Sequence, residues 1–315
     1  NYSPYKNVNR VAPGAMFTID VKSKKTKQIG GLPLIYQPET FFDTVEKCKF
    51  ELASALKASA ISIAPKEGGW GTYLSGGIDS STATALLSAD RDDLLTYTLG
   101  TEYGDEYSDA KELADFLELS HECVFANSGQ AISHFEKAIF CNEIVDGLTA
   151  ETLAQLSVLT EAASQKVRNI VTGYGADLLF GSMLRHKLYM QVTGVDDLQS
   201  LIERTCWSGE FSPFYAWSLG VEVHHLFWDP ALMNAAFKIP VDWSFDGTRE
   251  KILLRTLVVD EGIMEESHAF RKKHAMTDGT QFNRVLSGAL ELDDIYGYHL
   301  KTKASISVLK RIFQD

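Results

Sequence analysis

Residues 70–172 alternate short apolar segments with segments of helical periodicity, and this alternation limits the choice of fold more than any other feature. Parallel strands need a long crossover connection, which is usually a helix packed on the sheet. The alternation therefore predicts an α/β protein with a parallel sheet and helices on both faces. Ligands of such folds bind beyond the carboxyl ends of the strands. The expected strands are Trp70–Leu74, Leu94–Leu99, His121–Phe125 and Asn169–Thr172, and the expected helices between them include Asp79–Ala89 and Ser108–Leu117.

The segments before and after this region follow other patterns. Ala15–Val21 and Gln28–Tyr36 are extended stretches separated by a polar turn, which predicts a β-hairpin. An isolated hairpin is marginally stable in water, so we expect another element to cover it. An amphipathic helix is expected over Glu39–Ala60. From about residue 190 the pattern is mainly helical, with apolar periodicity in Lys251–Val259 and Arg284–Leu292.

The overall charge narrows the classes of partner. The 315 residues carry 30 Lys and Arg against 42 Asp and Glu, a formal net charge of −12. Such a chain is a poor general binder of nucleic acid or of an anionic membrane surface, although a single site for an anion needs only local positive charge. No segment approaches the ~18 apolar residues of a membrane span and no signal peptide is visible, so we expect a cytoplasmic protein.

A glycine-rich turn joins the first expected strand directly to a helix. Glycines let the backbone approach a ligand closely, and the start of the helix offers free N–H groups and a positive dipole end that favour phosphate. Asp79 would repel a bare phosphate, so it fits better as a Mg²⁺ ligand. The alternative is an ordinary turn in which the serines cap the helix. The residues expected to bind nucleotide here are Leu74, Ser75, Gly76, Gly77, Asp79, Ser80 and Ser81.

Two motifs carry a family resemblance. Ser-Gly-Gly-x-Asp-Ser after a strand, at residues 75–80, is the signature of the ATP-pyrophosphatase fold. Residues 171–181 (VTGYGADLLFG) resemble a motif of asparagine synthetases, and the tyrosine between the glycines resembles β-lactam synthetase and carbapenam synthetase. Further matches to carbapenam synthetase lie at residues 96–102, 142–151, 207–211, 220–228 and 271–273. The chain thus resembles the β-lactam synthetase and carbapenam synthetase family, within the asparagine synthetase class B superfamily.

The resemblance implies a division into domains. Residues 37–315 would form an ATP-dependent synthetase domain with a five-stranded parallel sheet, of the adenine nucleotide alpha hydrolase-like, ATP-pyrophosphatase type, and a helical C-terminal part. Residues 1–36 resemble the last strands of an N-terminal glutaminase-like (Ntn) domain, the rest of which is missing or is a separate chain. In lactam-forming enzymes that domain is inactive, because the substrate itself supplies the amine. A homo-oligomer is compatible with this family.

The resemblance also assigns the residues that hold ATP and Mg²⁺. Asp79 and Asp177 would hold the metal against the phosphates, where it neutralises charge on departing pyrophosphate. The alternative is that both aspartates cap helices. Lys251 would contact phosphate, and residues 95–100 would line the adenosine pocket, mainly through their backbone. The other cofactor-binding residues expected there are Tyr97, Thr98, Leu99 and, in the second motif, Gly173.

The resemblance assigns catalysis to Tyr174, Glu210 and Lys273. A substrate ammonium must lose a proton before it attacks, and a phenol with a pKa near 10 needs a hydrogen-bonded carboxylate to act as its acceptor. Lys273 would stabilise charge on the carbonyl oxygen and on phosphate during ring closure. The alternatives are a tyrosine packed in a turn and two solvated surface charges.

Two further pairs of polar residues leave alternatives open. Glu102 and Glu106 either face the substrate amine or are ordinary loop carboxylates. His224 and His225 are adjacent on an extended segment and should point to opposite sides, which favours structural roles over a shared metal.

The expected reaction converts the carboxylate of a β-amino acid into an acyl-adenylate, with release of pyrophosphate. Intramolecular amide formation then releases AMP and gives a β-lactam, which suits antibiotic or toxin biosynthesis. The alternatives are an asparagine-synthetase-like amidotransferase, a peptide macrolactam cyclase and a non-catalytic nucleotide-binding protein. Residues 274–279 (HAMTDG) depart from the Ile/Leu-Gly-x-His-Glu-Gly of close relatives. The expected substrate is a small amino acid, and this departure leaves its identity open.

Overall fold

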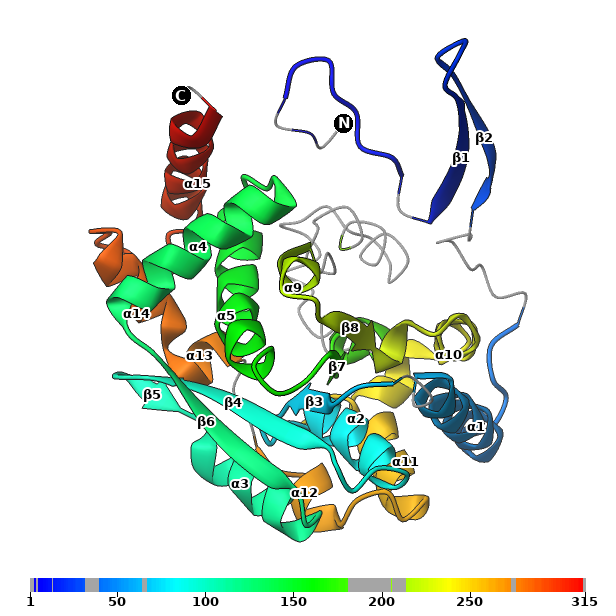
Figure 1. Ribbon diagram of the computed structural model, residues 1–315. Coiled ribbons are helices and arrows are strands. Elements are labelled where there is room, and N and C mark those ends of the chain that lie inside the picture. The colour runs from blue at the N-terminus through cyan, green and yellow to red at the C-terminus, as the bar shows by residue number, and fades with distance from the viewer. Residues whose placement is uncertain are drawn as a thin grey trace.

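A parallel β-sheet forms the centre of the protein, and helices pack on both of its faces (Figure 1). The computed structural model describes residues 3, 5–12, 14–31, 40–63, 67–180, 205, 214–272 and 276–313. The predicted five-stranded parallel sheet is confirmed, and a two-residue strand, β5 (Gly104–Asp105), pairs antiparallel with the end of β4. In spatial order the parallel strands are β6 (Ser120–Ala126), β4 (Leu95–Thr101), β3 (Trp70–Tyr73), β7 (Asn169–Thr172) and β8 (Glu222–His225).

The strand order fixes where a ligand can bind. The chain runs outward from β3 to β4 and β6 on one side, and later returns to place β7 and β8 on the other side. This reversal makes the carboxyl end of β3 a topological switch point, which is the usual binding crevice of a parallel α/β sheet. The Ser-Gly-Gly turn leaves β3 at this point.

Each face of the sheet has its own apolar core. Trp70, Leu52 and Leu56 belong to the core on one face, and Tyr97, Phe135 and Phe282 to the core on the other. No helix in the described part of the chain combines the length and the hydropathy needed to cross a membrane. The first core includes residues of α1 (Val45–Ile63), α2 (Ile78–Ser88), α6 (Ala176–Leu179), α10 (Pro230–Phe237), α11 (Ile252–Asp260) and α12 (Glu266–Ala269). The second includes residues of α4 (Ser128–Asn142), α5 (Gly147–Ala163), α9 (Phe214–Ser218), α14 (Phe282–Ala289) and α15 (Tyr298–Phe313). The shorter α3 (Tyr107–Phe116) and α13 (Met276–Thr280) pack near β4.

Two helix ends differ from the sequence prediction by several residues, for local reasons. The first helix begins at Val45 and not at Glu39, and the Thr44 hydroxyl accepts a hydrogen bond from the Lys47 N–H (3.3 Å) beside its first turn. The last predicted helix ends at Ala289, because the chain soon turns through Glu291 with φ of 56°. Strand β8 lies in the part predicted to be mainly helical.

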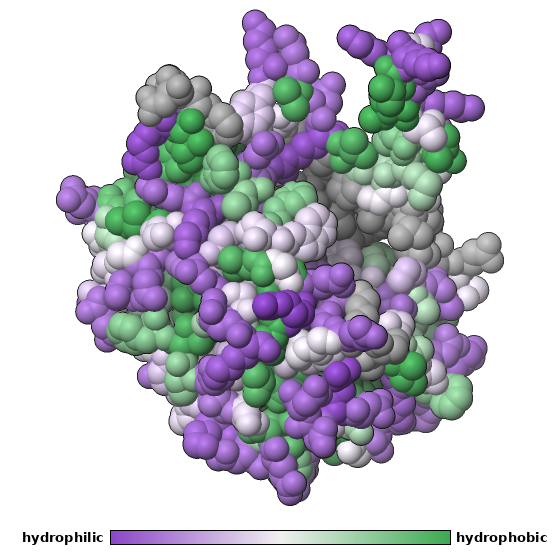
Figure 2. All heavy atoms as spheres, viewed as in Figure 1, coloured by the Kyte–Doolittle hydropathy of each residue, from purple (hydrophilic) through white to green (hydrophobic). Residues whose placement is uncertain are grey.

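The predicted N-terminal hairpin is present as β1 (Ala15–Asp20) and β2 (Lys25–Gly31), which pair antiparallel. Its second strand begins earlier than predicted, because the Asp20 carboxylate accepts hydrogen bonds from the N–H groups of Lys22 and Ser23 (both 2.9 Å) and tightens the turn. Residues 32–36 of the predicted stretch lie outside the described residues. The hairpin stands away from the sheet (Figure 1), and Figure 2 shows apolar residues on this projection. Its exposed apolar side chains include Met16, Phe17, Ile19 and Ile29.

Candidate active site

The two glycine-containing loops meet at the carboxyl edge of the sheet. Strands β3 and β7 are neighbours, so the loop after Tyr73 and the loop after Thr172 leave the sheet side by side. A Cβ added to Gly173 would lie 2.3 Å from the carbonyl carbon of Asp79 and 2.5 Å from the Ser80 nitrogen. The two backbones are thus in direct contact, and only a glycine at position 173 allows this approach.

The N–H groups at the start of α2 donate no hydrogen bond to a capping side chain. Gly77 is the N-cap residue, and no side chain caps the helix. The Ser80 hydroxyl instead contacts the Ser75 hydroxyl (2.9 Å) and accepts a hydrogen bond from the Ser75 N–H (3.2 Å). Ser81 is fully buried, and its hydroxyl has no hydrogen-bond partner within the described residues. The alternative in which the serines cap the helix is therefore wrong.

Gly76 allows a close contact between the turn and α3. Gly76 has φ of 68°, and a Cβ there would lie 2.8 Å from the Cβ of Asp109. Its small size therefore serves the approach of α3 to the turn, and not only the approach of a ligand. Gly76 and Gly77 are buried, whereas Ser75 and Asp79 remain partly exposed.

We expect Ser80→Ala to destabilise the protein by about 1 kcal/mol, because it removes the side-chain hydrogen bonds that hold the turn. Urea denaturation measures the loss. Ser88→Ala, at the other end of α2, is the matched control, since its hydroxyl makes one local bond to the Ala85 carbonyl (3.0 Å). Equal stabilities of Ser80→Ala and the parent protein would contradict the role given to this hydroxyl.

The two predicted metal-binding carboxylates converge on one lysine. The Lys251 ammonium lies 2.5 Å from Asp79 Oδ2 and 2.5 Å from Asp177 Oδ1. Burial lowers the pKa of Lys251, but the two carboxylates outweigh burial and raise the pKa overall, so the side chain is charged at neutral pH. Neither aspartate caps a helix, because Gly77 and Gly175 are the N-cap residues of α2 and α6. The alternative that both aspartates are helix caps is therefore wrong.

This pair of carboxylates fits a hard divalent cation. Oxygen ligands are the ones that Mg²⁺ prefers, and it commonly takes one or two carboxylates together with water and substrate phosphates. Both oxygens already lie within reach of a single positive group. Among the residues that the structure describes, no three His, Cys, Asp or Glu side chains gather as a metal site. The pair therefore suits a metal that is shared with a nucleotide.

The residues expected at the adenosine pocket are largely buried. The side chains of Tyr97, Thr98 and Leu99 are each at most 2% exposed. Leu74, also buried, donates its N–H to the Tyr97 carbonyl (2.9 Å), and the Thr98 hydroxyl donates to the Leu74 carbonyl. These contacts join β4 to the base of the turn, and they leave little of these side chains for direct contact with a ligand.

Tyr174 lies between the second loop and β8. Its N–H donates to the Thr172 hydroxyl (3.3 Å), which in turn contacts His225 Nδ1 (2.7 Å). The rings of Tyr174 and His225 are 5.9 Å apart. His224 points to the opposite side, where it stacks on Trp70 at 5.5 Å. The prediction that the two histidines diverge is confirmed.

Two predicted catalytic residues, Glu210 and Lys273, lie outside the described residues. Arg271 donates to the Asp109 carbonyl (2.9 Å) and pairs with Glu112 (2.7 Å) on α3. Gly279 packs so closely on Glu106 that an added Cβ would lie 2.6 Å from its carboxylate. Both described flanks of residues 273–275 are thus joined to the segment after β4. The partners of Arg271 could not be predicted from the RKK motif, because they lie about 160 residues away in the sequence.

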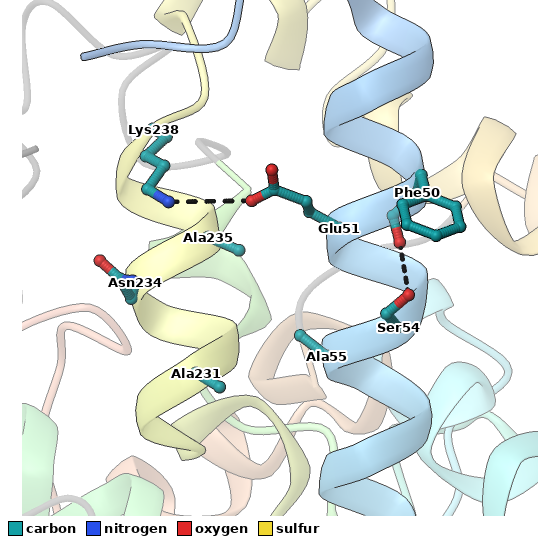
Figure 3. A pocket seen from close by; sticks show the side chains of 8 residues that line it. All are labelled: Phe50, Glu51, Ser54, Ala55, Ala231, Asn234, Ala235 and Lys238. Carbon is teal, nitrogen blue, oxygen red and sulfur yellow. Dashed lines mark hydrogen bonds and ion pairs between the residues drawn. The ribbon is translucent and has the colours of Figure 1, made fainter.

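The remaining polar residues, Glu102 and Glu106, follow β4, and a surface groove lies between two helices. Glu102 is exposed, and Glu106 is partly buried against Gly279. A groove between α1 and α10 (Figure 3) is crossed by an ion pair between Glu51 and Lys238 (3.7 Å). None of the residues that line this groove belongs to the candidate site.

Comparison with known proteins gives one family. Residues 51–208 match the family model described as asparagine synthase. The carboxyethyl-arginine beta-lactam-synthase of Streptomyces clavuligerus is 28% identical over 189 residues, which are 59% of this chain and 36% of that protein. The glutamine-hydrolyzing asparagine synthetase of Zea mays is 24% identical over 290 residues, 82% of this chain and 48% of the relative. The chain therefore spans less than half the length of these relatives.

The likeness to solved structures is looser. The NMN synthetase of Francisella tularensis superposes with a TM-score of 0.36 and 14% identity, over 84% of this chain and 93% of that chain.

Proposed function

The chain belongs to the asparagine synthase family, and from that premise we propose that it is an ATP-dependent ligase that releases AMP and pyrophosphate and closes an amino acid into a lactam. The observation that carries the proposal is the convergence of Asp79 and Asp177 on one cation beside the uncapped start of α2. A nucleotide tail needs N–H donors for its phosphates and carboxylates that can hold the divalent cation that neutralises them.

The first half of the proposed reaction takes place at the Ser75–Ser81 turn. A substrate carboxylate oxygen attacks the α-phosphorus of ATP, which forms the acyl-adenylate and breaks the bond to pyrophosphate. The N–H groups at the start of α2 and the hydroxyls of Ser75 and Ser80 would bind the phosphates. Mg²⁺, held by Asp79 and Asp177, would neutralise charge on the departing pyrophosphate.

The second half closes the ring. The substrate ammonium loses a proton to the Tyr174 oxygen as the phenol proton passes to the Glu210 carboxylate, and the resulting amine attacks the acyl carbon. A C–N bond forms, the bond between the acyl carbon and the AMP oxygen breaks, and Lys273 stabilises the charge on both oxygens. Holding amine and acyl carbon in one site removes the cost of a bimolecular encounter. These three roles rest on the motifs at residues 171–181, 207–211 and 271–273.

We expect Tyr174→Phe to slow ring closure by about a hundredfold while adenylation changes little, because only ring closure needs the phenol as a proton acceptor. Exchange of labelled pyrophosphate into ATP measures adenylation, and mass spectrometry of the product measures closure. Tyr103→Phe is the matched control, since Tyr103 is exposed on the loop after β4. A larger loss of exchange than of closure would exclude this role for Tyr174.

The second candidate function is amidation of an amino acid with ammonia. The 24% identity to an asparagine synthetase over 82% of this chain favours it. Incubation with ATP, Mg²⁺ and either a panel of β-amino acids or aspartate with ammonium separates the two. AMP release with loss of water from a β-amino acid supports the lactam-forming reaction. Turnover of aspartate only with ammonium favours amidation instead.

Residues 1–36 are proposed to complete an N-terminal glutaminase-like domain, and residues 37–315 to form the synthetase. The exposed apolar side chains of β1 and β2 support this division, since a hairpin of this kind needs a covering sheet. Arg10 ties the segment before the hairpin to the end of α4, where it donates to the carbonyl groups of Asn142 and Glu143 (both 2.9 Å). The protein partner proposed for the hairpin is therefore the remainder of that domain.

A further inference from the structure

We propose that Lys251 is an internal counter-cation that holds the metal-binding carboxylates in the free enzyme and gives them up only to a metal that arrives with its nucleotide. The inference rests on the proposed function, because it takes Asp79 and Asp177 as the metal ligands. It adds that free divalent metal is excluded from the site by the protein itself.

The geometry of Lys251 supports this exchange. Its ammonium is 2.5 Å from one oxygen of each aspartate, so it sits where a cation shared by both carboxylates has to sit. A Mg²⁺ ion needs oxygen ligands at about 2.0–2.1 Å, and it would overlap an ammonium that already touches the same two oxygens. Occupation by the lysine and occupation by a metal that uses both oxygens are therefore mutually exclusive.

The surroundings direct the exchange toward the nucleotide side. The Lys251 side chain is 7% exposed, whereas those of Asp79 and Asp177 are 25% and 58% exposed. The lysine thus approaches the carboxylates from inside the protein, and a ligand approaches them from solvent. The four-carbon side chain of lysine is flexible, so rotation about its bonds can move the ammonium away from the carboxylates while the backbone stays in place. Phosphates that bind beside the carboxylates offer the displaced ammonium a new partner.

The backbone holds Lys251 at this position. It is the N-cap residue of α11 and has φ of 55°, a left-handed conformation that is uncommon for residues other than glycine. One turn later, the Arg255 guanidinium donates to the Glu250 carbonyl (2.9 Å) and to the Ala269 carbonyl, which ties the start of α11 to the end of α12. The lysine is therefore placed by the fold, and not by a mobile surface segment.

The exchange predicts an order of binding. Without nucleotide, metal has to displace the ammonium and leave it buried without a partner, which is unfavourable. With nucleotide, the phosphates neutralise the displaced charge, so metal and nucleotide bind together. Removal of the lysine charge should uncouple the two.

The test measures binding of Mn²⁺ from the electron paramagnetic resonance signal of the free ion, in the presence and absence of α,β-methylene-ATP. The parent protein should bind Mn²⁺ tightly only with the nucleotide. Lys251→Met keeps the length of the side chain without its charge, and it should bind Mn²⁺ without nucleotide at least tenfold more tightly than the parent. Lys251→Arg keeps the charge and should show no such gain, and adding Asp177→Asn to Lys251→Met should remove the gain.

Unchanged or weaker binding of free Mn²⁺ by Lys251→Met, with normal binding of Mn²⁺ and nucleotide by the parent, overturns the inference and leaves the proposed function in place. Absence of Mn²⁺ binding by the parent even with nucleotide removes the proposed metal site and the inference together. If Lys251→Met unfolds at assay temperature, its Tm is measured against Mn²⁺ concentration. A rise in Tm that the parent does not show supports the inference, and no rise overturns it.

Discussion

Gly173→Ala is expected to reduce AMP release by about a hundredfold or more. The new Cβ would lie 2.3 Å from the carbonyl carbon of Asp79, which is backbone and cannot rotate away. The loop after β7 has to move by roughly 1 Å to restore an ordinary contact, and a misplacement of this size at a reacting centre costs about a hundredfold in rate. Asp177 moves with this loop, so the two carboxylates would no longer meet at one cation.

The control for this change is Gly288→Ala in α14, where an added Cβ has no heavy atom within 4 Å. That substitution should leave AMP release unchanged and raise stability by up to about 1 kcal/mol, because alanine favours a helix more than glycine does. Thermal unfolding should show a loss of about 1–3 kcal/mol for Gly173→Ala from overpacking. Normal AMP release in a folded Gly173→Ala protein would show that the contact between the loops is not needed.

Lys273→Ala is expected to reduce lactam formation by about 10²–10³-fold, because a charge that stabilises the transition state of ring closure is lost. ATP binding, measured by calorimetry, should change little, since the phosphates are proposed to bind at the Ser75–Ser81 turn. Lys272→Ala is the matched control: it removes the neighbouring charge, whose side chain is exposed. Near-normal turnover of Lys273→Ala would remove this lysine from the mechanism.

The sheet was predictable because its strands carry strong local signals. Trp70–Tyr73 and Asn169–Thr172 are short and buried along their whole length, and each is followed by a glycine-containing turn. Strand β8 contains two histidines, and its side chains are half-buried or exposed, so its apolar pattern is weak. It is a strand because it pairs with β7, and this partner is not visible in its own sequence.

The candidate site was predictable where a motif stays within one loop, and not where distant elements meet. Asp79 and Asp177 stand in recognisable motifs, but Lys251 reaches Asp79 from 172 residues away, through the placement of α11. Its contact with the two carboxylates depends on tertiary packing. The contact of Gly76 with Asp109 is a similar case. The glycine in the sequence indicates a close approach of some other segment, but it does not indicate that this segment contains Asp109.

The most direct test of the central claim follows an oxygen atom. A β-amino acid that supports AMP release is labelled with ¹⁸O in its carboxylate and incubated with the protein, ATP and Mg²⁺, and the AMP is analysed by mass spectrometry. If the carboxylate attacks the α-phosphorus, one ¹⁸O atom is transferred to each AMP formed, and the lactam retains the other. Unlabelled AMP, or labelled phosphate accompanied by ADP, would contradict acyl-adenylate formation at the Ser75–Ser81 turn.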